Sequence, residues 1–182
     1  MIFVQSFKII ISVAIGILST LTSLMYTAEG DGFPIPPRSN KTLFYIQRST
    51  NANTIMYEAN IENKNIDEDD PVSVYWIRYA EKGQRRKLNY IERVMAYGVT
   101  CKPTANHSFI LHFNASSSKE VLVLLDSKGV AHARMSINKK NSTLEKIFVM
   151  VTDKSFIPKV DYVEFFGTDV TTGEKTYEKM MI

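Results

Sequence analysis

The amino-acid sequence predicts a mainly β protein, an antiparallel meander with one short α-helix. Runs rich in aromatic and β-branched residues recur along the chain, turn-forming residues separate them, and the connections in the second half are short and polar. Short connections place successive strands side by side in antiparallel order. Because closure removes exposed strand edges, we expect a closed or nearly closed barrel, or a two-sheet sandwich.

The first 28 residues have the layout of a secretory signal peptide. Lys8 is the only charged residue before Glu29, an apolar run follows over residues 9–18, and Ala28 is a small residue at a candidate cleavage site. The segment is also long and apolar enough to remain as an uncleaved membrane anchor. Either reading predicts export to the periplasm or the cell envelope.

The rest of the chain predicts a linker and one domain. Residues 29–40 contain two glycines and three prolines, which favour an extended linker, and residues 41–182 form a single β-rich domain. Cys101 is the only cysteine, so no internal disulfide can form, which fits a bacterial envelope protein better than a small secreted eukaryotic domain that relies on disulfides. The net charge of +3 is scattered along the chain and gives no basic stripe for nucleic acid.

The first half of the domain predicts three strands and one helix. We expect strands over residues 42–48, 54–61 and 72–80, the first two joined by a turn at residues 51–53. Asn89 and Glu92 have capping-box spacing, and the helix starts there or earlier, near Arg85. Its apolar stripe, which packs on the sheet, consists of Tyr90, Val94 and Tyr97 with Ile91 and Met95 beside them, and Gly98 ends it in a left-handed conformation.

The second half predicts six more strands. They cover residues 108–114, 120–126, 130–137, 144–152, 159–167 and 175–181. Their connections are short and polar, so the strands should pair in sequence as hairpins.

One stretch resembles a known family. The carrying residues are Phe44-Tyr45-Ile46-Gln47-Arg48, Asn53, Tyr57, Pro71-Val72, Tyr75-Trp76-Ile77-Arg78-Tyr79, Gly83, Leu88 and Ala96-Tyr97-Gly98. This pattern resembles the exported bacterial proteins, mostly of the Bacteroides group, that share the domain of unknown function 4833. The resemblance implies export and a bacterial host. It implies no activity and assigns no catalytic residue.

Polar and aromatic residues of the first half form the candidate ligand site. Arg78 shares a strand face with Trp76 and could stack on the indole ring while pairing with an anion; otherwise it reaches solvent from the strand end. The basic run Arg85-Arg86-Lys87 at a helix start would favour an anion, or else form a solvated turn. The candidate ligand-binding residues are Gln47, Arg48, Tyr75, Trp76, Arg78, Tyr79, Arg85 and Arg86.

No pattern predicts catalysis, a metal or a cofactor. Asn63, Asn65, Asp67 and Asp69 begin like a calcium loop, but Glu68 and Val74 occupy the positions that need Gly and Glu. Cys101 and His107 lack the signature of a cysteine nucleophile, and nothing brings His107, His112 and His132 together for zinc.

These observations predict an exported envelope protein that binds a small amphipathic or anionic ligand, or a partner protein, without catalysis. A hydrolase of cell-envelope glycans or lipids is the first alternative, and a structural subunit of an envelope assembly is the second. The expected partner is a small ligand or an envelope protein. A membrane contact is expected only through an uncleaved N-terminal segment.

Overall fold

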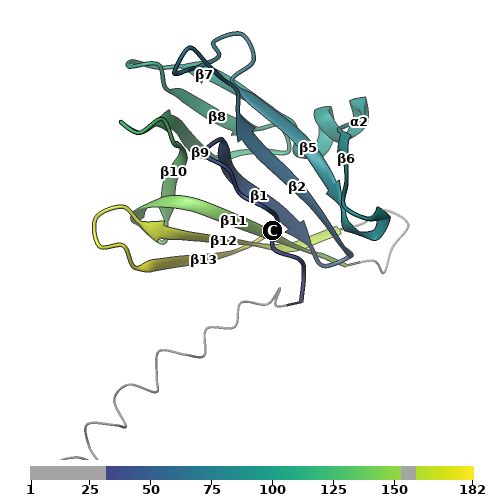
Figure 1. Ribbon diagram of the computed structural model, residues 1–182. Helices are drawn as coiled ribbons and strands as arrows, with labels where there is room; N and C mark the ends of the chain where they lie inside the picture. Colours follow the sequence, from purple (N-terminus) through teal and green to yellow (C-terminus); the bar gives the residue numbers. More distant parts are fainter. Residues whose placement is uncertain (1–31, 153–158) are drawn as a thin grey trace, which may run out of the picture. The chain divides into compact units, whose positions relative to one another are not determined.

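The computed structural model describes residues 32–152 and 159–182, and the predicted signal segment lies outside them. The described chain is mainly β, with one large curled sheet, a separate two-stranded sheet of β3 and β4, and a short helix (Figure 1). The strands are β1 (Thr42–Arg48), β2 (Asn51–Ala59), β3 (Ile61–Glu62), β4 (Asn65–Ile66), β5 (Val72–Arg78), β6 (Gln84–Lys87), β7 (Val99–Pro103), β8 (Phe109–Phe113), β9 (Ser116–Leu125), β10 (Ala131–Ile137), β11 (Lys140–Thr152), β12 (Lys159–Asp169) and β13 (Lys175–Met181).

The long strand β11 is the branch point of the sheet. Its first residues pair antiparallel with β10, its middle pairs with β1, and its other edge pairs with β12, which is followed by β13. The β1–β11 pair is parallel, which the predicted meander did not include. A parallel pair is possible here because about 100 residues separate the two strands, so no short hairpin dictates their direction.

Two arms leave β11 and curl towards each other. One arm runs β1-β2-β5-β6 and the other runs β10-β9-β8-β7. The rings of Phe44 and Tyr57 stack with centroids 4.4 Å apart, and the ring of Phe113 on β8 meets both edge-on. Aromatic pairs in these geometries add to the stability that their burial gives, so the arms are joined by a shared hydrophobic core.

The sheet stays open, in contrast to the closed barrel that we considered. β6 ends the strand order on one side and β7 ends it on the other, and within the described residues they do not pair. The result is an open half-barrel (Figure 1). The residues of its core lie between Leu43 and Met180, so residues 33–182 contain the whole described core.

Each of the nine predicted strands has a counterpart in the structure, and the bounds of β1 and β13 agree with the prediction residue for residue. The first hairpin is also present, but it turns at Ser49 and Thr50, because Arg48 pairs with Asn51. The basic run Arg85-Arg86-Lys87, predicted to lie at or before the helix start, belongs to β6 instead. Every residue of β6 is exposed, so this edge strand lacks the alternating apolar pattern by which strands are predicted.

The predicted capping box is confirmed at the start of helix α2 (Tyr90–Glu92). The Asn89 side chain accepts a hydrogen bond from the Glu92 N–H, and the Glu92 carboxylate accepts one from the Asn89 N–H, both at 2.8 Å. A π-helical segment η2 (Arg93–Tyr97) continues the chain. We call residues Tyr90–Tyr97 together the α2–η2 helix.

The prediction that an apolar stripe packs the helix on the sheet is wrong for most of its residues. Only Tyr97 packs inward, whereas Tyr90, Ile91, Val94 and Met95 are exposed. A π-helical turn contains more residues than an α-helical turn, so Tyr97, three residues after Val94, does not share a face with it.

Gly98 ends the helix for a different reason from the predicted one. Its φ of −67° is not left-handed. A Cβ at this position would lie 1.9 Å from the Arg93 carbonyl oxygen, so glycine is required by close backbone approach.

Gly98→Ala should therefore destabilise the domain by about 2–3 kcal/mol, because the backbone of η2 must move to admit the methyl group. Gly129→Ala is the control, since a Cβ there meets nothing within 4 Å and only its φ of +76° is unfavourable. We expect about 1 kcal/mol for that change. Urea unfolding of both variants measures the difference, and equal costs would contradict the close-approach explanation.

Candidate functional site

The predicted ligand-binding residues lie on two opposite faces of the first arm. The inner face, which looks into the core, carries Arg48, Trp76 and Arg86, as the pairing of Ile55 with Trp76 and of Trp76 with Arg86 shows. The outer face carries Tyr75 and Tyr79 in a small cluster with Tyr45, Met56 and Ile77. Successive strand residues point to opposite faces, so Tyr75 and Trp76 cannot grip one ligand from the same side.

On the inner face, Arg48 is held by two aromatic rings. Its guanidinium group lies 5.0 Å from the centre of the Trp76 ring and 5.7 Å from that of Tyr97. It also donates a hydrogen bond to the Tyr97 hydroxyl at 2.9 Å. Arg48 therefore joins β1 and β5 to the α2–η2 helix.

Glu92 connects the start of the α2–η2 helix to the inner face of the first arm. It forms an ion pair with Arg86 and accepts a hydrogen bond from the Asn89 N–H. Partial burial acts to raise the pKa of Glu92, but the Asn89 N–H, the Arg86 guanidinium and the Trp76 indole N–H together lower it below its ordinary value. The Arg86 charge is thus already partly neutralised within the protein.

Two further predicted residues make local contacts. Buried Gln47 donates hydrogen bonds to the Pro34 carbonyl at 2.9 Å and to the Thr54 hydroxyl at 3.2 Å. Arg78 forms an ion pair with Glu81 three residues later. The Gln47 contacts connect the segment at Pro34 and strand β2 to β1, and the Arg78 ion pair connects the end of β5 to the residues that follow it.

On the outer face, Arg85 lies over the Tyr75 ring, 4.9 Å from its centre. Burial, followed by the nearby Glu58 carboxylate, raises the pKa of Tyr75 to about 12. The Tyr75 hydroxyl therefore stays protonated at neutral pH and can act only as a neutral hydrogen-bonding group.

A groove of about 570 Å³ lies between the two ends of the open sheet. It is bounded by the first half of β5, by β6 with Leu88, and by the start of β7. We call it the basic groove because of its charged lining, Arg85, Arg86, Lys87 and Arg93; its apolar lining is Val72, Val74, Leu88 and Val99. One carboxylate, that of Asp70, also lines it.

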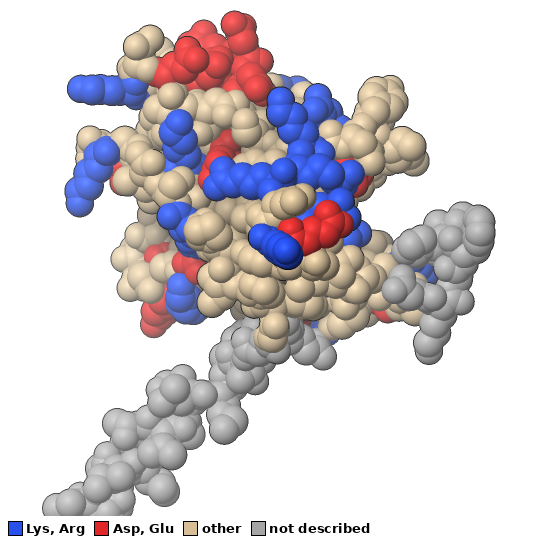
Figure 2. Space-filling view, turned by 45° about the vertical axis from the view of Figure 1, so that its right-hand side comes forward, with Lys and Arg blue, Asp and Glu red and all other residues tan. Residues whose placement is uncertain are grey.

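Three cations of the basic groove have no ion pair with the described part of the chain. These are Arg85, Lys87 and Arg93, whereas Arg86 is paired with Glu92. In Figure 2, which brings the β6 and α2 side forward, Lys and Arg side chains form a band across the middle of the face, and acidic side chains gather at its top. The groove therefore presents positive charge beside apolar surface.

The sequence pointed to part of this groove. Tyr75, Arg85 and Arg86 were predicted and line it, while Gln47, Arg48, Trp76, Arg78 and Tyr79 do not. Arg93 and the apolar lining were not predicted as site residues. The basic run at residues 85–87 is visible in the sequence as three consecutive cations. Arg93 and Val99 are brought to the groove by the tertiary structure, so no local pattern predicts them.

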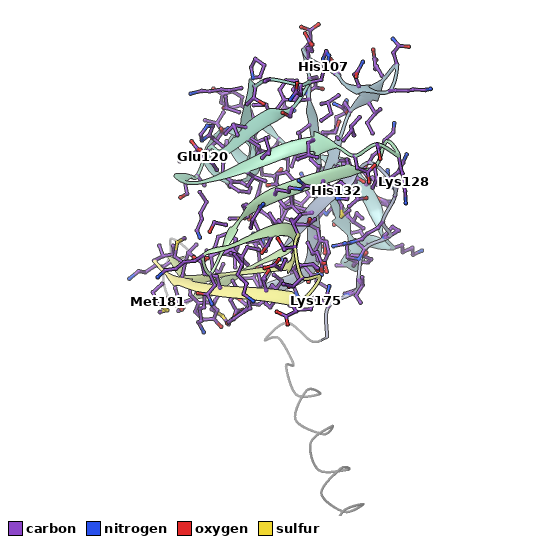
Figure 3. All side chains as sticks on the ribbon, turned by 90° about the vertical axis from the view of Figure 1, so that its left-hand side faces the viewer. His107, Glu120, Lys128, His132, Lys175 and Met181 are labelled. Atoms are coloured by element: carbon purple, nitrogen blue, oxygen red, sulfur yellow. The ribbon has the colours of Figure 1, made fainter. Side chains whose placement is uncertain are left out.

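The remaining candidate groups are dispersed. Burial and then Asp70 raise the pKa of the Cys101 thiol to about 11, so it is protonated at neutral pH. The three histidines lie near different acids, His107 near Glu68, His112 near Glu120 and His132 near Asp126. Figure 3 shows His107 and His132 far apart, and no metal-binding group of three or more His, Cys, Asp or Glu occurs in the residues that the structure describes.

Arg86→Gln should raise the pKa of Glu92 towards its ordinary value, because the change removes a cation that favours the carboxylate. Arg85→Gln is the control, since Arg85 contacts Tyr75 instead. NMR titration of the side-chain carboxyl carbon measures the Glu92 pKa in both variants. An unchanged Glu92 pKa in Arg86→Gln would contradict the ion pair between Arg86 and Glu92. Because folding lowers this pKa, the stability that it contributes is present above the unfolded value and is lost as pH falls through the folded value.

Comparisons with known proteins give a family and no relative of known activity. A family model described as "Domain of unknown function (DUF4833)" matches residues 44–179. The comparison with curated proteins and that with solved structures found no match. No helix in residues 32–152 and 159–182 has the length and apolar character that crossing a bilayer requires. The match spans well over half of the chain, and the protein therefore belongs to the DUF4833 family.

Proposed function

We propose that the domain is a non-catalytic binding module that takes a small amphipathic anion in the basic groove. The observation that carries this proposal is the presence of three cations without an ion pair, Arg85, Lys87 and Arg93, in one groove with apolar side chains. Such cations favour a carboxylate, sulfate or phosphate group, and the apolar lining favours a short hydrocarbon part. The apolar N-terminal segment supports export, which would place the module in the cell envelope.

The composition of the groove favours binding over hydrolysis. A hydrolase of envelope glycans or lipids needs an acid and a base within reach of one bond. Among the described residues that line the groove, Asp70 is the one carboxylate and no histidine is present. The cations instead suit a ligand that is held and released unchanged.

Replacing Lys87 and Arg93 together by glutamine should weaken the binding of decanoate to residues 33–182. Each exposed charge contact is worth about 0.5–1 kcal/mol, so the dissociation constant should rise by about 5–30-fold. Neither side chain has a hydrogen bond or ion pair in the described structure, so folding should be unaffected. Isothermal titration calorimetry measures the affinity.

The matched control is Lys128→Gln with Lys139→Gln, which changes the net charge equally in two exposed turns. Decanol and inorganic phosphate test the apolar part and the charge separately, and each should bind more weakly than decanoate. Equal loss of decanoate affinity in the control would show that net charge, and not the groove, attracts the ligand. No binding of any of the three probes would overturn the proposal.

A further inference from the structure

The exposed part of the α2–η2 helix is an apolar surface that the described residues of the domain leave uncovered. Tyr90 is 79% exposed, Ile91 67% and Met95 73%, with Val94 beside them. Folding normally buries such side chains, and exposed apolar patches of this kind mark sites of interaction. The capping box fixes the start of this helix, so the side chains are presented on an ordered segment.

Positively charged residues precede this apolar surface along the chain and lie within the helix that carries it. Residues 85–97 contain four cations, Arg85, Arg86, Lys87 and Arg93, and one carboxylate, Glu92, which is paired with Arg86. Arg93 belongs to the helix itself, and the other three cations lie on β6, which immediately precedes it. Apolar side chains flanked by cations on a short amphipathic segment match the interface of a bilayer that carries anionic lipids.

We propose that the α2–η2 helix docks the domain on an anionic lipid surface. Ile91, Met95 and Tyr90 enter the headgroup region, while Lys87 and Arg93 lie against the lipid phosphates. Tyrosine suits this position because its ring is apolar and its hydroxyl is polar. This contact is separate from the N-terminal segment and does not depend on a ligand in the basic groove.

The charge pattern favours lipid over the other occupants of such a surface. A second copy of the chain would bring the same unpaired cations, Arg85, Lys87 and Arg93, near each other, which is repulsive. An anionic bilayer offers negative charge over the whole footprint and an apolar layer below it. The basic groove lies beside the helix, so docking would bring its opening close to the same surface.

The test is co-sedimentation of residues 33–182 with sonicated vesicles. One set is phosphatidylcholine alone, and the other is phosphatidylcholine mixed with phosphatidylglycerol, which supplies the anionic surface. The apolar N-terminal segment is omitted because it would bind lipid by itself. We expect binding to the anionic vesicles, weak binding to neutral ones, and release as salt screens the charges.

A matched pair of variants tests the surface. Ile91→Ser with Met95→Ser should lower partition into anionic vesicles by roughly 10-fold. Met181→Ser with Ile182→Ser removes the same residue types at nearly the same exposure, 69% and 65%, and should leave partition unchanged. Met181 lies at the lower edge of the molecule in Figure 3.

The outcomes are distinct. Equal binding to neutral and anionic vesicles, or equal loss in both double variants, would overturn the proposal. Concentration-dependent dimerisation that Ile91→Ser with Met95→Ser abolishes would also overturn it and would assign the surface to a second copy. Decanoate affinity measured on the same variants separates this contact from groove binding, because neither residue lines the groove.

Discussion

The anchoring of Tyr97 on the inner face is the interaction on which the candidate site depends. Its carbonyl accepts a hydrogen bond from the buried Tyr57 hydroxyl at 2.8 Å, and its own hydroxyl accepts one from Arg48. Its ring meets Trp76 edge-on, with centroids 5.3 Å apart. Because β6 and β7 do not pair, these contacts hold the segment between them across the open side of the sheet.

The contacts of Tyr97 fix both the exposed apolar surface of the α2–η2 helix and the side of the helix that lines the basic groove. With Tyr97 turned inward, the preceding turn of the helix directs Ile91 and Met95 outward, and the same turn brings Arg93 to the basic groove. Gly98 lets the chain pass directly beneath the Arg93 carbonyl and continue into β7. A ligand would therefore meet a groove that is already formed, which reduces the entropy lost on binding.

Features that depend on residues close in the sequence were predicted correctly, and features that depend on distant residues were not. β1 and the capping box of Asn89 and Glu92 depend on neighbouring residues, so the sequence pattern was enough to predict them. The parallel β1–β11 pair has no local signature, because it joins strands about 100 residues apart. β6 is exposed throughout, so its basic residues resembled a helix start. Likewise, Arg85 and Arg86 were predicted as ligand-binding residues. Arg93 and Val99 were not, because they reach the groove only through the contacts that hold Tyr97, which lies between them, on the inner face.

The most direct test of this account is amide chemical-shift mapping of residues 33–182 during titration with decanoate. The account predicts that the shifts concentrate at residues 72–75 and 85–88 and at Arg93, Gly98 and Val99, which line the basic groove, and that β12 and β13 stay unaffected. Shifts spread evenly over the domain, or centred on the outer cluster of Tyr45, Met56 and Ile77, would contradict it.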